Sequence, residues 1–412
     1  MSAVTIVGLA AMAVDLSFAI TLQSRMQSAA DSAALAAAAA LPDQATAVAT
    51  AQEYSGKNLA VAQNGDVLVA NDVIFGNWSN DTRVFVPNPP LAAVNAVEVN
   101  LRRAESNGNP VGTFFASIFG ISSFDLSASA IAVANKGELT CLLVLDPDDE
   151  DALRLDANAE IDVEDCSVHV NSTHSTALYV RSNSNLTADS ICVAGGYQDD
   201  SSGGINPTPT VNCAQQTDPL LDLPEPDTAG CDETGYSLSS NNSDTIDPGI
   251  YCGGITVSSN ANLTFNPGTY VIKDGAFNAS SNATLAGSQV FFYLTGASSL
   301  IDFDSNSDVS LSAPNSGDYE SVVFFQDRDD GGIHRFDSNS NNSVTGIVYL
   351  PNGALHSASN TMLTSPTNCL MLIVGTAEFS SNSGFTTAPN QSVCPFDIPD
   401  GLYQTGQLAL RR

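Results

Sequence analysis

Basic residues are scarce in this chain of 412 residues. Lys and Arg together number 13, against 45 Asp and Glu, and the formal net charge is −32 at pH 7. Such a chain repels nucleic acid and anionic lipid headgroups, so neither is an expected partner. Charged residues are only 14% of the sequence. The surface must therefore consist largely of Ser, Thr and Asn, which is typical of an exported protein in an aqueous medium.

Cysteine is absent from the first 140 residues, and no Cys-x-x-Cys pair or suitable histidine spacing supports a zinc site. The even number of cysteines that follows indicates disulfides formed in an oxidising compartment. Among the 105 connectivities that eight cysteines allow, we favour pairing in sequence order, which closes spacings of 25, 21, 21 and 25 residues. The disulfide candidates are Cys141, Cys166, Cys192, Cys213, Cys231, Cys252, Cys369 and Cys394.

Helical periodicity is missing from residues 156–385, where a short phrase recurs, for example Ser-Asn-Ser-Asn-Leu at 182–186. The first Asn of each phrase recurs at steps of 25, 77, 22, 24, 33, 21 and 22 residues. A period in this range indicates a solenoid, with insertions at the two long steps. The apolar runs between the phrases, such as 290–294 and 370–374, predict buried strands. The recurring residues are Asn158, Asn183, Asn260, Asn282, Asn306, Asn339, Asn360 and Asn382.

These features predict a mainly β fold built on a right-handed parallel β-helix of about 22 residues per coil. Stacked coils place each Asn above the preceding one, where the amides can form a ladder. Residues 197–248 contain six prolines and two cysteines. We expect them to form an ordered insertion pinned by disulfides, acting either as a recognition loop or as a cover for a coil edge. The tail after Phe385 is expected to cap the last coil.

Catalytic motifs are also missing, since no glycine-rich phosphate loop and no nucleophile motif occurs. Glycoside hydrolysis needs two carboxylates facing one cleft, and lyase chemistry needs a base with neighbouring cations. The ladder already explains the aspartates of the repeated phrases, so we predict that the protein is not an enzyme. A polysaccharide-degrading enzyme is the less favoured alternative, and its candidate cluster is Asp302, Asp304, Asp327, Arg328, Asp329, Asp330, His334, Arg335 and Asp337.

Two acidic runs, 146–151 and 327–331, contain the carboxylate oxygens that calcium prefers. The second run lacks the full spacing of a calcium loop. A solvated acidic turn is the default interpretation of both runs. We therefore predict no cofactor and keep calcium as the alternative.

No basic residue precedes the apolar segment 3–22, whose length suits a transmembrane helix. A signal peptide is the rival interpretation, but a basic start and a cleavage site before Gln23 are missing. Asp15 interrupts the segment and would cost about 2.5–3.5 kcal/mol at the bilayer centre. It is expected either to contact a neighbouring membrane helix or to reach water near the membrane edge. Residues 23–40 are strong helix formers that continue the helix as a stalk.

A family resemblance rests on the N-terminal residues. Val14-Asp15 in an apolar segment, followed by Leu-Gln-Ser-Arg-Met-Gln-Ser-Ala-Ala-Asp-Ser-Ala-Ala-Leu-Ala at 22–36, resembles the TadG-like proteins of bacterial tight-adherence (Flp) pilus-assembly systems. Residues 60–136 resemble their membrane-proximal part. From Cys141 onward the chain resembles the β-helical exported region that some of these proteins carry in place of a von Willebrand A domain, whose Asp-x-Ser-x-Ser motif is absent here.

The resemblance implies three domains. They are a transmembrane helix with an Ala-rich stalk at 1–59, a small α+β exported domain at 60–136 and the β-helix at 137–412. It implies an envelope protein anchored in the inner membrane, with a periplasmic or extracellular C-terminal region and pilus-machinery partners. Its expected role is structural, in assembling or anchoring the pilus. A cell-surface adhesin that binds surface glycans through the β-helix is the alternative function.

Overall fold

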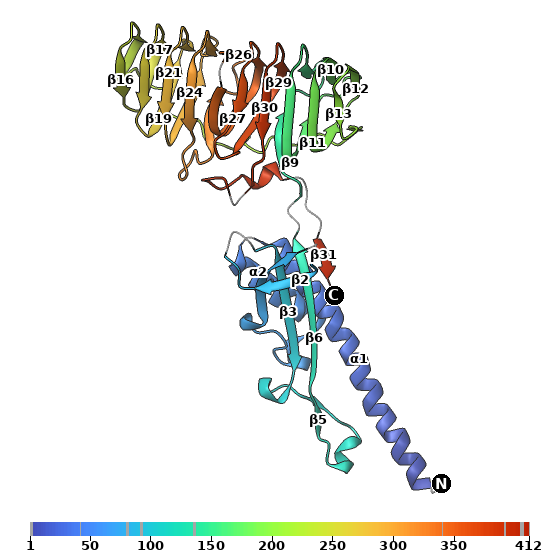
Figure 1. The fold of residues 1–412 in the computed structure, drawn as a ribbon. Coiled ribbons are helices and arrows are strands. Elements are labelled where there is room, and N and C mark those ends of the chain that lie inside the picture. Colours follow the sequence, from blue (N-terminus) through green and yellow to red (C-terminus); the bar gives the residue numbers. More distant parts are fainter. Residues whose placement is uncertain are drawn as a thin grey trace. The chain divides into compact units, whose positions relative to one another are not determined.

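The computed structural model describes residues 3–41, 43–79, 82–90, 94–134, 137–339, 341–390, 393–403 and 408–411. The chain divides into an N-terminal unit, Met1–Gly137 with Thr405–Arg412, and a solenoid unit, Glu138–Gln404 (Figure 1). Strands account for 45% of the chain and helices for 16%, and the solenoid has about 11 turns. The predicted mainly β solenoid fold is therefore confirmed.

The N-terminal unit begins with α1 (Ala3–Ala39), followed by α2 (Gln44–Asn58), α3 (Val61–Asn64) and the short turn η1 (Ala70–Asp72). The side chain of Asp43 accepts hydrogen bonds from the backbone N–H groups of Ala45 and Thr46, which fixes the start of α2. Within the described ranges, no helix combines the length and the apolar character needed to cross a membrane.

An antiparallel sheet completes this unit, in the order β2-β1-β3-β6-β31. Fully buried alanines of α1, among them Ala30, Ala33 and Ala37, share a core with Val97 and Val99 of the sheet. The small side chains explain how the helix comes so close to the sheet, and why helix and sheet form one unit. The bounds are β1 (Val73–Ser79), β2 (Val84–Pro87), β3 (Ala96–Arg103), η3 (Glu105–Asn107), β4 (Val111–Gly112), η4 (Ala116–Phe119), β5 (Ser123–Phe124), β6 (Leu126–Ala134) and β31 (Leu408–Arg411).

The end of the chain differs from its prediction. Phe396, Ile398 and Leu402 of the tail do pack into the solenoid core. The last described residues, however, return to the N-terminal unit, where β31 pairs antiparallel with β6. Backbone hydrogen bonds of a sheet edge therefore hold this terminus, which no local sequence pattern indicated.

The solenoid unit consists of parallel strands stacked coil on coil. From the start of the unit, the chain forms β7 (Thr140–Val144), β8 (Leu153–Leu155), β9 (Glu160–Val170), β10 (Leu178–Ser182), β11 (Asn185–Val193), β12 (Tyr197–Ser201), β13 (Gly204–Asn206) and β14 (Thr210–Val211). It then forms β15 (Glu233–Leu238), β16 (Ser243–Ile246), β17 (Gly249–Val257), β18 (Asn262–Phe265), β19 (Gly268–Lys273), β20 (Phe277–Ala279), β21 (Thr284–Gly287), β22 (Val290–Thr295), β23 (Ile301–Asp304), β24 (Asp308–Ser312), β25 (Val322–Gln326), β26 (Gly332–Asp337), β27 (Asn341–Ser357), β28 (Met362–Thr364), β29 (Leu370–Phe379), β30 (Gly384–Thr387) and η5 (Asp400–Leu402).

The coils do not stack in sequence order. The last coil lies against the first, because β29 pairs with β7 and β8, and β30 pairs with β9. The chain thus enters the solenoid in its middle and builds outward to β14 at one end. Residues 214–232, here called the crossover, then lead to β15 at the other end, from which the coils return to the middle (Figure 1).

This path corrects the predicted insertion at 197–248. Its first part, β12 to β14, stacks on β10 and β11, and its last part, β15 and β16, stacks on β17 and β18. Most of the segment therefore forms the two terminal coils, and only the crossover lies outside them. Three of the six prolines, Pro219, Pro224 and Pro226, lie in the crossover that connects the two coil stacks.

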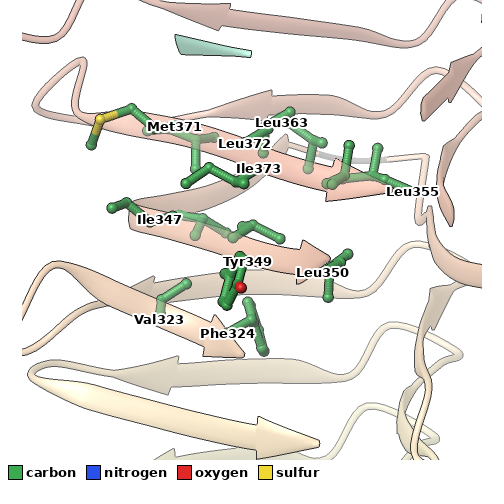
Figure 2. Close-up of a cluster of buried hydrophobic side chains, with 14 of the residues drawn as sticks. Val323, Phe324, Ile347, Tyr349, Leu350, Leu355, Leu363, Met371, Leu372 and Ile373 are labelled. Carbon is green, nitrogen blue, oxygen red and sulfur yellow. The ribbon is translucent and has the colours of Figure 1, made fainter. Parts of the chain in front are cut away.

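Aromatic and branched side chains fill the interior between the two ends. Phe292 stacks on Tyr270 and on Phe324, with 5.3 Å between ring centroids in both pairs. The strand register continues this row from Phe324 to Val348 and Leu372, and Figure 2 labels Phe324 and Leu372 among the buried side chains of this part of the solenoid. Buried aromatic residues contribute most to core stability through their large apolar area. The stack explains how a polar, Asn-rich sequence supports a rigid solenoid.

Candidate functional site

The recurring Ser-Asn pairs form the corners of the coils. Ser281 and Asn282, for example, have φ angles of 56° and 60°. Asn occupies this left-handed region at less cost than most residues with a β-carbon. The recurrence of Asn therefore has a conformational cause in addition to its hydrogen bonds.

The corner amides bond to one another from coil to coil. Side-chain amides donate to the next Asn Oδ1 at 2.8–3.1 Å in six pairs: Asn183–Asn158, Asn158–Asn382, Asn382–Asn360, Asn360–Asn339, Asn339–Asn306 and Asn282–Asn260. The order departs from the predicted sequence order at one step. Asn158 bonds to Asn382, 224 residues away, and Asn183 and Asn260 are not neighbours in these pairs. A further corner at Ser240 and Asn241, also with positive φ, was missed in the sequence.

All four predicted disulfides are present. They join Cys141–Cys166, Cys192–Cys213, Cys231–Cys252 and Cys369–Cys394, with Cα–Cα distances of 5.3–6.0 Å. Cys213 of the second disulfide directly precedes the crossover, and Cys231 of the third disulfide lies at its end. They tie both of its ends to the stacked coils.

A row of charged side chains crosses the outer face of neighbouring strands. Three of the five Lys and Arg residues between 138 and 404 take part: Arg154, Arg181 and Arg335. The strand register places Arg335 beside His356, His356 beside Glu378, and Glu378 beside Arg154. This polar row therefore brings together residues from both halves of the solenoid, which meet at β29 and β8.

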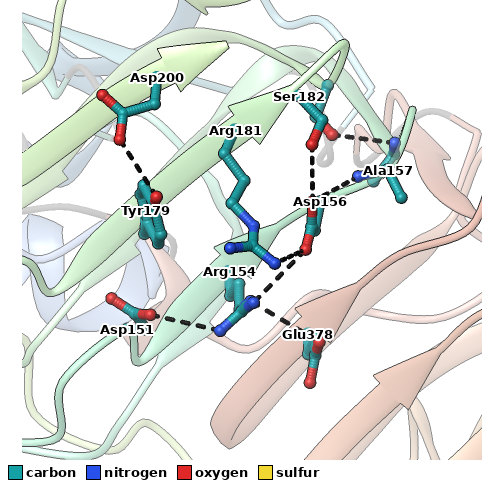
Figure 3. A network of polar contacts seen from close by, with 11 residues as sticks. Asp151, Arg154, Asp156, Ala157, Tyr179, Arg181, Ser182, Asp200 and Glu378 are labelled. Carbon is teal, nitrogen blue, oxygen red and sulfur yellow. Dashed lines mark hydrogen bonds and ion pairs between the residues drawn. The ribbon is translucent and has the colours of Figure 1, made fainter.

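Asp156 is the centre of the interactions in this row (Figure 3). It forms ion pairs with Arg181 and with Arg154, and its Oδ1 accepts a hydrogen bond from the Ser182 hydroxyl at 2.9 Å. The Arg181 hydrogen bond is the main cause that lowers the pKa of Asp156, from 3.8 to about 2. Arg154 also approaches Glu378, at 3.7 Å. The row is thus a connected network at neutral pH.

His356 lies 3.2 Å from an Asp337 carboxylate oxygen, and Arg335 lies 3.6 Å from the other oxygen. The hydrogen bond to Asp337 raises the pKa of His356 above its ordinary value. The imidazole therefore gains positive charge in mildly acidic solution. This places a pH-dependent cation on the polar row.

Two adjoining hollows lie along one edge of the row. The first has a volume of about 640 Å³ and is lined in part by Asp146, Asp149, Asp218, Arg328 and Asn352. The second has a volume of about 460 Å³ and is lined in part by Arg154, His356 and Glu378. Both include Asp149, Ile333, Ala354 and Thr376, so they form one groove. The groove is the candidate binding site of the solenoid unit.

The proposed catalytic cluster does not converge on this groove. His334 is fully buried, burial lowers its pKa to about 4, and its Nδ1 accepts a hydrogen bond from the Ile301 N–H. Asp327 accepts hydrogen bonds from Thr295 and from the Asp329 N–H, and therefore holds a turn. The strand register pairs Asp302 with Arg335 and Asp304 with Asp337, while Asp330 Oδ2 accepts a hydrogen bond from the Gly296 N–H. Of these residues, Arg328 alone is among those that line the groove.

Arg328 instead holds the crossover in place. Its guanidinium donates to the carbonyl oxygens of Leu220 and Leu223 at 2.6 and 3.0 Å and pairs with Glu225 at 3.1 Å. The group lies over the Phe325 ring, 4.7 Å from its centroid. These contacts connect the turn after β25 to the crossover.

The two acidic runs are organised by their own backbones. Asp146 Oδ1 accepts hydrogen bonds from the N–H groups of Asp148 and Asp149 at 3.0 and 2.8 Å. Within the ranges that the structure covers, no group of three or more His, Cys, Asp or Glu side chains is arranged to hold a metal ion. Both runs therefore have the geometry of capped turns.

Asp15 has partners that neither alternative from the sequence included. Its side chain is 3% exposed. Oδ1 accepts a hydrogen bond from the Phe114 N–H at 2.7 Å, and Oδ2 accepts from Phe115 and Ala116 at 2.9 and 2.6 Å. The carboxylate thus joins α1 to the start of η4, about 100 residues later in the chain.

The comparisons with known proteins concern this same unit. Residues 1–40 match a family of TadE/G-like Flp pilus-assembly proteins, and residues 27–132 match a family of Tad-like Flp pilus-assembly proteins. No curated protein and no solved structure matches the chain. These matches cover residues 1–132 and support the sequence resemblance to the TadG-like proteins of tight-adherence (Flp) pilus assembly.

Proposed function

We propose that the protein is a membrane-anchored, exported structural component that takes part in assembling or anchoring a tight-adherence pilus. The carrying observation is the apolar exterior of α1 on the unit that matches the pilus-assembly families. Met12, Val14, Leu16, Phe18 and Ile20 are each between 42% and 61% exposed. At 3.6 residues per turn, alternate residues lie on opposite sides of a helix. An apolar surface on several sides suits a lipid environment better than a single docking face.

The solenoid unit supports the exported part of this proposal. Its four disulfides require an oxidising compartment to persist. With about 11 turns and roughly 4.8 Å between neighbouring strands, the stack is about 50 Å long. Such a stack is a stiff spacer, because each coil is held by its neighbours through continuous backbone hydrogen bonds. A stiff, disulfide-pinned body is suited to a structural role outside the cytoplasm.

The test removes residues 138–404 and counts pili by electron microscopy. Leu139 and Tyr403 form an antiparallel bridge, so the chain enters and leaves the solenoid at one place. A short Gly-Ser linker can therefore replace the unit and leave β31 on its sheet. Loss of pili, with the shortened protein still in the membrane fraction, is the expected result. Normal pili would exclude an assembly role for the solenoid.

Anchoring is tested separately by deleting residues 3–22 from the full chain. We expect the deleted protein to leave the membrane fraction, because the exposed apolar side chains of α1 are then absent. A deleted protein that stays with the membrane through washes at high pH would contradict the anchor. The matched control deletes an equally long part of the solenoid, residues 249–268, which should not release the protein.

A second candidate function is a glycan-binding adhesin, favoured by the groove beside Arg154, His356 and Glu378. Polar side chains from three strands there present both donors and acceptors to solvent. We expect Arg154→Ala and His356→Ala to abolish binding on a glycan array, and the exposed Asp199→Ala to have no effect. An intact protein that binds no glycan would remove this candidate.

A further inference from the structure

We propose that residues 111–124, here called the arm, insert into the lipid bilayer beside α1. The arm comprises β4, η4 and β5 with their connections, and residues 110–124 contain no charged side chain. Its outer surface is apolar: Phe114, Phe115, Ile118, Phe119 and Ile121 are between 41% and 78% exposed. This inference rests on the proposed membrane anchor and adds a second lipid contact to it.

The arm is attached to the apolar part of α1. Asp15 accepts the N–H groups of Phe114, Phe115 and Ala116, and the rings of Phe18 and Phe114 pack edge to face at 5.4 Å. The N-terminal unit thereby places its two exposed apolar surfaces together. In water, this arrangement would leave both apolar surfaces exposed to solvent.

The backbone of the arm is also prepared for a medium without water. Lipid requires that N–H and C=O groups find partners within the protein, at several kcal/mol for each one left unpaired. Thr113 N–H donates to Ser122 O, Gly120 N–H to Ser117 O, and Ile121 N–H to Ala116 O, each at 3.1 Å. Three further N–H groups, those of Phe114, Phe115 and Ala116 at the start of η4, donate hydrogen bonds to the Asp15 carboxylate. The same three hydrogen bonds offset the free-energy cost of placing the Asp15 carboxylate in lipid.

The depth of the arm follows from the change in polarity along α1. Gln23 and Gln27 donate to the Ser127 and Ser129 carbonyl oxygens at 2.6 and 2.9 Å, and Arg25 is exposed at this level. Asp15 lies eight residues earlier, about 12 Å along a helix. One leaflet of the hydrocarbon core is about 15 Å thick. The arm therefore fits within a single leaflet while Arg25 reaches the headgroups.

Lipid fits this surface better than a protein partner does. A partner helix or sheet would cover one face, but the exposed residues of α1 lie on more than one side and the arm extends the apolar surface further. Large aliphatic and aromatic residues without charge are also the composition found in the bilayer interface. The occupant to which the geometry points is the acyl-chain region of a phospholipid leaflet.

The test uses tryptophan fluorescence in phosphatidylcholine vesicles with and without brominated acyl chains. Trp78 is the only tryptophan, so Trp78→Phe provides a background for Phe119→Trp in the full chain. We expect blue-shifted emission that brominated lipid quenches for the most part. Because Trp78→Phe alters a buried site, Phe119→Trp with Trp78 retained is measured in parallel and compared with the wild type by difference.

Two matched reporters separate the failure of the arm from the failure of the anchor. Leu16→Trp reports on α1 and should be quenched, whereas Val84→Trp, on an exposed strand, should stay accessible to acrylamide and unquenched. Quenching of the Leu16→Trp reporter without quenching of the Phe119→Trp reporter overturns the proposal that the arm inserts into lipid, and it leaves the proposed membrane anchor in place. Loss of quenching at both overturns the anchor as well. Blue-shifted emission at the arm that brominated lipid does not quench shows that the arm is covered by protein, within this chain or from a second copy of it, and overturns the lipid proposal.

Discussion

The two units differ in how many of their large apolar side chains are exposed. Among the described residues, 15 large hydrophobic side chains are exposed in the N-terminal unit and four in the solenoid unit. Every phenylalanine between 138 and 404 is buried, whereas Phe18, Phe114, Phe115 and Phe119 are exposed. The solenoid therefore hides its aromatic residues between coils, and the N-terminal unit presents them outward.

The difference indicates how each unit obtains its stability. The solenoid buries its own apolar core, because the stacked coils cover each other and the disulfides fix the crossover. The N-terminal unit contains no cysteine and places its exposed apolar residues on α1 and the arm, where an apolar medium can cover them. Changes that act on one means of stabilisation should therefore leave the other unit unaffected.

Reduction of the disulfides should separate the units most strongly. A disulfide spanning 21 or 25 residues contributes about 3 kcal/mol, so losing four should lower the solenoid's stability by several kcal/mol. Urea unfolding with and without a reductant is followed by circular dichroism for the solenoid and by Trp78 fluorescence for the N-terminal unit. An equal shift of the Trp78 transition would show that the units unfold together and would break the comparison.

The same substitution in both units gives the next largest contrast. Phe324→Ala removes a fully buried ring and should lower the solenoid's free energy of unfolding by about 3–5 kcal/mol. Phe119→Ala removes an exposed ring and should change stability in water by no more than about 0.5 kcal/mol. Urea midpoints in detergent-free buffer measure both. A large loss from Phe119→Ala would mean that the arm packs against the protein itself.

Removing the carboxylate that caps the arm should have an intermediate effect. Asp15→Ala leaves three backbone N–H groups without their acceptor, at about 1–3 kcal/mol. Hydrogen exchange of Phe114, Phe115 and Ala116 should become faster. Asp43→Ala, which removes a similar cap from α2, is the control and should speed exchange only at Ala45 and Thr46. Unchanged exchange in the arm would mean that Asp15 does not hold it.

The sequence predicted the coils because their cause is local. A left-handed corner favours Asn at that position, which is a property of a few neighbouring residues. A cysteine one coil later in the sequence lies directly above its disulfide partner. The position of each coil in the stack has no local cause. Asn158 meets Asn382 only because the crossover returns the chain to the far end. Nothing near either residue encodes that step, so the path could not be predicted.

The candidate sites follow the same division. The sequence marked Asp15 as a charge in an apolar segment, but its partners are backbone groups 99–101 residues away, whose donors no residue pattern reveals. Arg154, His356 and Glu378 belong to one groove because the last coil meets the first. The residues of the cluster around Asp302 and His334 were close in sequence, but strand alternation buries His334 and leaves the adjacent Arg335 exposed.

A corner amide should contribute less than a core ring. Asn360→Ala removes a ladder bond and puts an ordinary side chain at a φ of 59°, which together cost about 1–2 kcal/mol. Asn360→Gly removes the amide but tolerates the angle, so it should cost less than Asn360→Ala. Urea midpoints of the two variants separate the terms. Equal losses would assign the whole role of the corner to hydrogen bonding.

The smallest effect is expected from pH, and it concerns the solenoid alone. The pKa of Asp156 is about 2 in the folded protein against an ordinary 3.8. A lowered pKa stabilises the fold above the ordinary value, and this contribution disappears as the pH falls from about 4 to about 2, by about 1 kcal/mol for a partly solvated group. Urea midpoints across this range should therefore fall more steeply for the wild type than for Asp156→Asn. Asp199→Asn, on an exposed side chain of β12, should keep the wild-type slope, and identical slopes for all three proteins would mean that the Arg154 and Arg181 ion pairs contribute no stability.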